Sequence, residues 1–268
     1  TSERNRKHCM VLENYCYRLF ELLVLNMVRN GFYGEIVSAD GAYLHNILGN
    51  ITNKNFKWNM WRLKENFRIG HLYPTHGLGP VAQTLDINRG DSMDYMVSMS
   101  SNDFVLEKRL KELRTKDNFY EPFLNKTYRG NTNTSIIRTK KGKLITLQHD
   151  VTSPNVFSTI YKVVGTKGTA LKYPLPEKIS DGGEDWLSAE EMKLIENKYQ
   201  PPIVKKLGET AMKLGGHGGG DFLMNWRLID CLRNGLPIDI DVYDTASWSV
   251  IAPLSERSVA YRSIPVDI

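Results

Sequence analysis

The 268-residue sequence lacks several features that would assign it to a class at once. Its three cysteines, Cys9, Cys16 and Cys231, follow no metal-ligand spacing and cannot all pair. Each lies in an apolar stretch and is expected to be a small buried side chain. No apolar run is long enough to span a bilayer, and no signal-peptide core follows the polar start. Both an exported and a cytoplasmic compartment therefore stay open.

The sequence also lacks a strong excess of charge. Lys and Arg number 35 against 30 Asp and Glu, and the basic residues are scattered. The densest basic run, residues 138–143, has Lys-Gly at its tip and β-rich flanks, which predicts a hairpin. Without a basic stripe or a binding motif, nucleic-acid binding is not expected. Hydrophobic residues make up 41% of the chain, which is enough for a sizeable globular core.

The periodic segments predict an α+β fold. Strands are expected over residues 8–13, 34–43, 95–99, 135–138, 144–149, 161–165 and 169–173. Helices are expected over residues 16–30, 75–85, 104–116, 188–213 with a break at Pro201-Pro202, 221–234 and 245–261. Thr75, Asp221 and Asp244 are the expected N-caps of three of them. This order predicts a mixed, largely antiparallel open sheet that is covered on one face by helices.

Residues 46–72 are predicted to form a long polar loop. The loop contains Trp58, Trp61 and Phe67. A loop of this length with several aromatic side chains is more often functional than a plain linker.

Residues 73–80, Tyr-Pro-Thr-His-Gly-Leu-Gly-Pro, concentrate glycine around a histidine at a predicted helix start. A helix start offers unpaired N–H donors and the positive end of the helix dipole. An imidazole there is well placed to move protons at neutral pH. His76 is therefore a candidate proton-transfer group. The alternative, a histidine that caps a tight turn, fits the spacing equally well.

A second glycine-rich stretch, residues 215–221, surrounds His217. It has neither the Gly-x-Gly-x-x-Gly order nor a following Lys-Ser/Thr, so a flexible ligand-facing loop is favoured over a phosphate loop, and a plain linker stays possible. Residues 165–168 predict a hairpin turn between two strands. His149 and Asp150 end a strand, where a structural role is favoured over a role in a site.

Two further groups of residues are candidates for ligand contacts. Glu13, Asn14 and Tyr17 lie where a predicted strand gives way to a helix, which is where α/β folds tend to bind ligands. Arg62 follows Trp61, so the guanidinium could hold a polar substrate while the indole stacks on a sugar ring. The alternative is a surface arginine beside a buried tryptophan.

Eight motifs occur in order along nearly the whole chain. They are residues 8–14, 41–45, 72–80, 88–91, 148–151, 216–219, 231–237 and 241–244. Together they resemble glycoside hydrolase family 109, which belongs to the Gfo/Idh/MocA oxidoreductase group. The resemblance implies a C-terminal substrate domain over residues 16–268. Residues 1–15 are expected to be the last-strand remnant of a dinucleotide-binding Rossmann domain, whose glycine fingerprint is missing from this sequence.

The family resemblance implies a retaining α-N-acetylgalactosaminidase that uses NAD instead of the usual pair of carboxylates. NAD, bound mainly by the missing domain, would oxidise the sugar at C3, and a base would then remove the C2 proton. Elimination of the glycosidic oxygen, addition of water and reduction would complete the reaction, and no metal is expected.

The resemblance also implies roles for individual residues. His76 matches the proton-transfer histidine, and Tyr73 is expected to share its proton or to hydrogen bond to the sugar. The expected substrate contacts are Tyr17, Arg62, His149 and His217, and the expected cofactor contacts are Glu13 and Asn14. Family members often have a tyrosine where this chain has Phe157, so a hydroxyl contact to the substrate is expected to be lost there.

Two other functions stay open at this point. The first is a sugar oxidoreductase of the same group that uses NAD(P) without cleaving its substrate. The second is a non-catalytic sugar-binding module. By itself the chain is expected neither to bind NAD tightly nor to turn over substrate. The surface that the missing dinucleotide-binding domain would cover is expected to carry an apolar patch. A homo-oligomer is expected to form through the sheet face.

Overall fold

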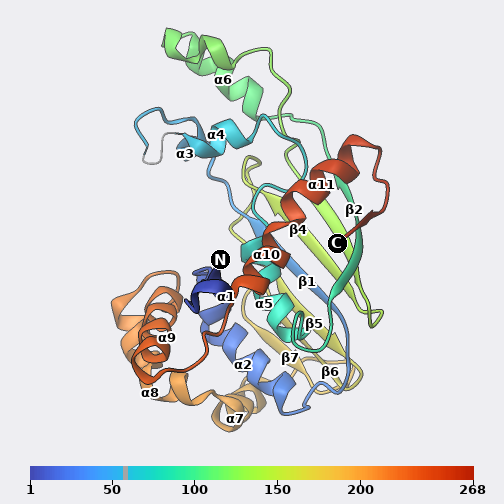
Figure 1. The fold of residues 1–268 in the computed structure, drawn as a ribbon, viewed down its shortest axis with the longest axis vertical. Coiled ribbons are helices and arrows are strands. Elements are labelled where there is room, and N and C mark those ends of the chain that lie inside the picture. The colour runs from blue at the N-terminus through green and yellow to red at the C-terminus, as the bar shows by residue number, and fades with distance from the viewer. Residues whose placement is uncertain (57–59) are drawn as a thin grey trace.

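The computed structural model describes residues 1–56 and 60–268, so the predicted aromatic Trp58 lies outside the described part. At its centre is one eight-stranded sheet (Figure 1). The strands are β1 (Ile36–Leu44), β2 (Met93–Ser100), β3 (Asn133–Thr139), β4 (Leu144–Asp150), β5 (Tyr161–Gly165), β6 (Gly168–Lys172), β7 (Lys178–Ser180) and β8 (Val266–Asp267). Their order is β7-β6-β5-β1-β4-β3-β2-β8, and β1 pairs with β4 in parallel while the other described pairings are antiparallel. The predicted mixed, largely antiparallel sheet is confirmed.

Helices cover one face of this sheet and leave the other face open (Figure 1). They are α1 (Ser2–Asn5), the 3-10 helix η1 (Asn14–Tyr17), α2 (Leu19–Arg29), α3 (Leu48–Thr52), α4 (Trp61–Glu65), α5 (Thr75–Thr84), α6 (Leu106–Arg114), the 3-10 helix η2 (Asn118–Phe123), α7 (Ala189–Tyr199), α8 (Pro202–Leu214), α9 (Gly220–Asn234), α10 (Val242–Ser249) and α11 (Ile251–Ala260). Helix α5 packs on β1, and α11 packs on β2. Side chains along each strand point alternately towards the helices and towards the open face. Met96, Ile137 and Ile145 point towards the helices and are fully buried beneath them.

A second hydrophobic cluster lies at the carboxyl end of β1 and β4. It contains Ile51 of α3, Leu63 of α4 and Leu110 of α6, all fully buried. These helices project beyond the end of the sheet (Figure 1). The cluster fixes the segment that carries Trp61 and Arg62 to the rest of the protein.

Two glycines set the distance between α5 and the sheet. A Cβ atom on Gly41 of β1 would collide with the main-chain carbonyl of Gly77, and one on Gly77 would lie 2.7 Å from Cδ1 of Leu147. Any larger side chain would therefore push the helix away from the strand. This close approach places His76, the residue before Gly77, over the ends of the two parallel strands.

A buried ion pair ties α2 to the sheet. Nζ of Lys172 on β6 lies 3.0 and 2.8 Å from the two carboxylate oxygens of Glu21. The two residues are only 7% and 3% exposed. Each charge is therefore neutralised by the other inside the core.

Three local predictions were wrong. Residues 8–13 form no strand, because no strand of the sheet lies beside them to share ladder hydrogen bonds. Cys9 in this segment is exposed, whereas Cys16 and Cys231 are buried as expected. Residues 46–72 hold the short helices α3 and α4 instead of one continuous loop.

The helix starts also differ from the prediction. Thr75 is the first residue of α5 and does not cap it, and Gly219 instead of Asp221 precedes α9. Asp241 is the N-cap of α10, where its side chain accepts from the main-chain N–H of Asp244. The Asp244 side chain accepts in return from Asp241 N at 3.0 Å, which completes a capping box. Of the helices that the structure describes, none is both long enough and apolar enough to cross a membrane.

Candidate active site

His76, the second residue of α5, is held by Glu13. Its Nδ1 lies 2.7 Å from Oε1 of the carboxylate, which also accepts from the main-chain N–H of Tyr15 at 3.1 Å. Glu13 is 2% exposed, so this partner is fixed within the protein. Because a carboxylate can only accept, Nδ1 carries the hydrogen of the neutral ring and Nε2 carries the lone pair. Nε2 has no hydrogen-bond partner among residues 1–56 and 60–268, so it is free to take a proton.

Three tyrosines enclose the His76 ring. The ring centroids of Tyr15, Tyr73 and Tyr43 lie 4.1, 4.6 and 4.9 Å from that of His76, all in edge-on contact. Burial raises the pKa of all three phenols above the ordinary value. They therefore stay protonated at neutral pH and can donate hydrogen bonds, while the proton acceptor of the cluster is His76.

The glycine-rich loop meets η1 on the far side of Tyr15. The ring of His217 lies 6.0 Å from that of Tyr15, and its Nδ1 is 2.8 Å from Oδ2 of Asp221. Asn14 donates from Nδ2 to the other oxygen of Asp221 at 2.5 Å. Burial acts to raise the pKa of Asp221, but the hydrogen bonds from Asn14 and His217 outweigh it and hold the pKa below its usual range. Asn14 and His217, far apart in sequence, are thus joined at the rim of the His76 site.

Arg18 links this rim to Phe157. Its Nε donates to the main-chain oxygen of His217 at 3.2 Å, and its NH1 donates to Oγ1 of Thr159 at 2.9 Å. The guanidinium carbon lies 4.0 Å from the ring centroid of Tyr15 and 5.9 Å from that of Phe157. Arg18 therefore holds the loop and the Tyr15 ring in place, while Phe157 contributes an apolar surface.

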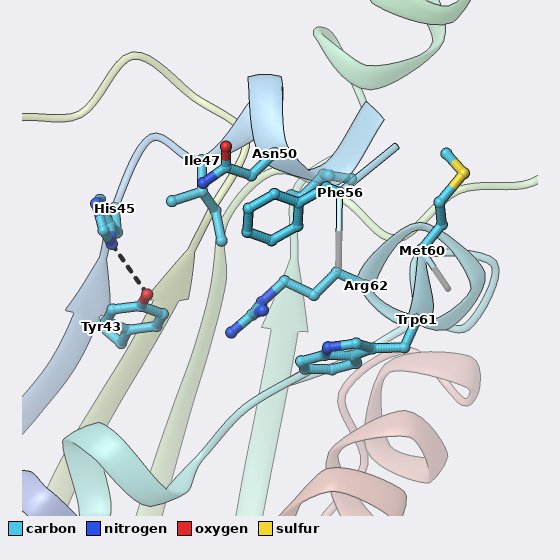
Figure 2. Close-up of a pocket in the computed structure, with 9 residues that line it drawn as sticks. Tyr43, His45, Ile47, Asn50, Phe56, Met60, Trp61 and Arg62 are labelled. Atoms are coloured by element: carbon cyan, nitrogen blue, oxygen red, sulfur yellow. Dashed lines mark hydrogen bonds between the residues drawn. The ribbon is translucent and has the colours of Figure 1, made fainter. Parts of the chain in front are cut away.

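Beyond Tyr43 the site continues into a cavity of about 190 Å³ (Figure 2). The residues that line it are Tyr43, His45, Ile47, Asn50, Ile51, Phe56, Met60, Trp61 and Arg62. The guanidinium carbon of Arg62 lies 4.3 Å from the ring centroid of Trp61, so the arginine does stack on its neighbour. The Trp61 ring lies 6.5 Å from that of Tyr73. Tyr43 and Tyr73 thus connect the cavity to His76.

His149 lies deep at the end of β4. Its ring centroid is 6.1 Å from Tyr43 and 5.0 Å from His71, and its Nε2 is buried with no hydrogen-bond partner in the described part of the chain. Burial, reinforced by the charge of Arg129, lowers the pKa of His149 to about 3. Burial also lowers the pKa of His71 well below its ordinary value. Both rings are therefore neutral and form the floor of the site.

The low pKa of His149 predicts that the free energy of unfolding falls in mild acid. The pKa of His149 is about 3 in the folded protein against an ordinary 6.5, so the unfolded chain binds more protons between these values. The contribution of His149 is complete above pH 6.5 and falls by about 1.4 kcal/mol per pH unit towards pH 3. We expect His149→Gln to reduce the difference between the unfolding free energies at pH 7.5 and pH 5, measured by denaturant titration. An unchanged difference in His149→Gln, or an equal reduction in the exposed control His8→Gln, would contradict the prediction.

Tyr17 does not join the His76 site. Its hydroxyl donates to Oδ2 of Asp239 at 3.2 Å, and the residue lines a separate cavity of about 690 Å³ between α2, α8 and α9. Tyr15, and not Tyr17, lies beside His76. In a 3-10 helix with three residues per turn, side chains two positions apart point in different directions. Only one of the two tyrosines can therefore face His76.

Sequence reasoning missed Tyr15, Arg18, Tyr43 and His45. For Tyr43 and His45 a signal existed, because they lie at the carboxyl end of a predicted strand. For Tyr15 and Arg18 no pattern distinguished them from core residues of the following helix. Among the described residues, no group of three or more His, Cys, Asp or Glu side chains is arranged to hold a metal ion.

Known proteins are similar to this sequence over nearly its whole length. The family model described as Glycosyl hydrolase 109, C-terminal domain, matches residues 17–268. A Glycosyl hydrolase family 109 protein of Solibacter usitatus is 46% identical over 268 residues, which cover 99% of this chain and 60% of that protein. Glycosyl hydrolase family 109 protein 1 of Bacteroides fragilis is 42% identical over 290 residues, covering 100% and 59%. The chain thus spans about three fifths of the length of these relatives.

The fold is shared with solved oxidoreductases. Levoglucosan dehydrogenase, in complex with NADH and levoglucosan, matches with a TM-score of 0.64 at 14% identity, over 98% of this chain and 66% of that one. This likeness confirms the expected Gfo/Idh/MocA-type fold. The match of the family model shows that the chain belongs to glycosyl hydrolase family 109, whose C-terminal domain it contains in residues 17–268.

Proposed function

We propose that this chain is the substrate domain of a retaining, NAD-dependent α-N-acetylgalactosaminidase. The observation that carries the proposal is the contact of His76 with the buried Glu13, which leaves a free Nε2 among three tyrosines. The rest of the complete protein would supply the dinucleotide-binding domain, and residues 1–15 would join that domain to residues 16–268.

The residues at the start of η1 fit the amide end of a nicotinamide cofactor. Oδ1 of Asn14 is buried and accepts no hydrogen bond from the described residues, so an acceptor is available for a carboxamide N–H. Glu13, the other expected cofactor contact, is already held by His76 and Tyr15. We therefore assign the cofactor contact to Asn14 and a supporting role to Glu13.

The side chains of this chain would handle the proton. NAD, when bound, supplies a reversible oxidation that makes the neighbouring C–H of the sugar acidic. His76 accepts that proton at Nε2, and the Glu13 carboxylate stabilises the charged ring that results. Tyr15, Tyr43 and Tyr73 donate hydrogen bonds to sugar oxygens, because their phenols remain protonated.

The test uses the complete protein with NAD and 4-nitrophenyl α-N-acetylgalactosaminide in deuterium oxide. We expect release of the phenol, retained anomeric configuration, deuterium at C2 and no net build-up of NADH. Sugar-dependent accumulation of NADH without cleavage would instead identify a sugar oxidoreductase. Saturable sugar binding with neither reaction would identify a binding module.

We also propose that the open face of the sheet pairs with a second copy of the chain. Four apolar side chains of the central strands are exposed on this face: Tyr95, Met99, Ile136 and Leu144. Exposed apolar side chains on adjacent strands are typical of an interface. Light scattering should give the mass of an oligomer, and Ile136→Lys should shift it towards the monomer. A monomeric wild-type protein would contradict this proposal.

A further inference from the structure

We propose that His217, oriented by Asp221, is a second proton-transfer residue of the reaction and accepts the hydroxyl proton of the sugar when C3 is oxidised. The inference rests on the proposed glycosidase function and adds a catalytic residue to it. It gives the glycine-rich loop of residues 215–219 a role in the chemistry and leaves His76 with the proton at C2.

The glycine-rich loop presents one side chain. All five residues from 215 to 219 have a positive φ, and His217, with a φ of 48°, is the one among them that is not glycine. A Cβ atom on Gly216 would lie 2.8 Å from Oδ2 of Asp221, so the neighbouring position has no room for a side chain. Nε of Arg18 donates to the main-chain oxygen of His217 at 3.2 Å and fixes the loop. Non-glycine residues are uncommon in this conformation, and such strain is concentrated at functional sites.

Asp221 sets the direction of the His217 ring. One carboxylate oxygen lies 2.8 Å from Nδ1, and the other accepts from Asn14 at 2.5 Å. Because a carboxylate can only accept, Nδ1 of the neutral ring carries the hydrogen and Nε2 carries the lone pair. In the part of the chain that the structure describes, no residue hydrogen bonds to this Nε2. His76 is held by Glu13 in the same way, so each histidine has a carboxylate that can stabilise the charged ring.

His217 and His76 both contact Tyr15. The centroid of the Tyr15 ring lies 4.1 Å from that of His76 and 6.0 Å from that of His217, and both contacts are edge-on. Burial and the charge of Arg62 lower the pKa of His45, and the charges of the other two histidines lower it further. Both rings are thus close enough to act on His45. The three imidazoles surround one space, in which the sugar is expected to bind.

The proposed reaction needs two proton acceptors. Oxidation breaks the C3–H bond, whose hydride passes to NAD, and the O3–H bond, whose proton must leave as the carbonyl forms. Elimination then breaks the C2–H bond, and its electron pair expels the glycosidic oxygen. His76 accepts the C2 proton, so the O3 proton needs another base. The final reduction returns this proton from Nε2 of His217 to O3 as the hydride returns to C3, so the ring ends each cycle neutral.

His217 is better suited to this step than His45. Nδ1 of His45 is hydrogen bonded to the hydroxyl of Tyr43 at 2.9 Å, and no carboxylate among the described residues contacts its ring. His217 has such a carboxylate, and Asn14, the proposed contact of the nicotinamide amide, binds the other oxygen of the same group. His217 therefore lies on the cofactor side of the site. The hydride leaves on that side, and the hydroxyl on the same carbon must lose its proton there.

The test separates the two proton transfers in the complete enzyme with NAD. His217→Asn removes the imidazole and keeps a residue type that tolerates a positive φ. With 4-nitrophenyl α-N-acetylgalactosaminide, we expect the rate of NADH formation in the first turnover to fall at least about 100-fold, as for loss of a general base. With the corresponding 3-keto glycoside, which is already oxidised, release of 4-nitrophenol should stay close to the wild-type rate.

Two variants serve as controls. His76→Ala should show the opposite pattern, with near-normal NADH formation and slow release from the 3-keto glycoside. His8→Asn changes an exposed histidine outside the site and should match the wild type with both substrates. Normal NADH formation by His217→Asn, or equal slowing of this variant with both substrates, would overturn the inference.

Sugar binding provides a measurement that needs no turnover. In the complete protein labelled with 15N-histidine, the Nε2 resonance of His217 should shift when N-acetylgalactosamine binds, and should not shift with its 3-deoxy analogue. The resonance is identified by its loss in His217→Asn. Equal shifts with the two sugars would show that Nε2 does not face O3 and would also overturn the inference.

Failure of the inference differs from failure of the proposed function. If the glycoside is not cleaved but NADH forms in a reaction that depends on His217, the glycosidase proposal fails and the role of His217 stands. If the glycoside is cleaved and His217→Asn forms NADH at the wild-type rate, the glycosidase proposal stands and the role of His217 fails.

Discussion

Replacing His76 with alanine in the complete enzyme is expected to lower kcat/KM by at least about 100-fold, the range in which a general base contributes. The hydrogen bond to Glu13 fixes Nδ1–H and leaves Nε2 as the free acceptor of the cluster. The three enclosing tyrosines cannot replace it, because burial keeps their phenols protonated. The rate of 4-nitrophenol release is the measurement.

A second readout distinguishes loss of the base from loss of structure. Deuterium incorporation at C2 should fall together with the rate in His76→Ala, and added imidazole should restore part of both. Far-ultraviolet circular dichroism should match the wild-type spectrum, and His8→Ala should behave as wild type because His8 is exposed and outside the site. Near-normal turnover by His76→Ala would remove His76 from the mechanism.

Lys172→Met is expected to lower the free energy of unfolding by about 3–5 kcal/mol. The substitution leaves Glu21, which is 3% exposed, without the cation that lies 2.8 Å from it. A buried carboxylate without a partner is strongly unfavourable, so helix α2 should lose much of its attachment to β6. Denaturant titration at neutral pH gives the free energy directly.

Two variants test that explanation. Adding Glu21→Leu to Lys172→Met removes the unpaired charge and should recover most of the stability. Lys213→Met breaks the exposed pair with Glu209 and should remain close to wild type. A double variant as unstable as Lys172→Met would show that packing, and not the unpaired charge, is responsible.

The boundaries of most elements could be predicted because they depend on neighbouring residues. The break at Pro201-Pro202 separates α7 from α8, and the hairpins of β3–β4 and β5–β6 form at their predicted turns. The prediction failed at residues 8–13, whose apolar pattern resembles a strand. A strand also needs a partner, and none is beside these residues in the described structure.

For the site, the sequence by itself determined the histidine and glycine at the start of α5 and the strands that end near residues 43 and 149. These follow from local spacing and from the family resemblance. The tertiary structure alone decided that Glu13 holds His76, that Tyr15 and not Tyr17 lies beside it, and that Arg62 faces a cavity without a carboxylate. The reason is physical. Glu13 and Tyr15 lie 63 and 61 residues before His76 in the chain, and the direction of a side chain decides between Tyr15 and Tyr17. Neither the contact nor the direction is encoded in a local pattern.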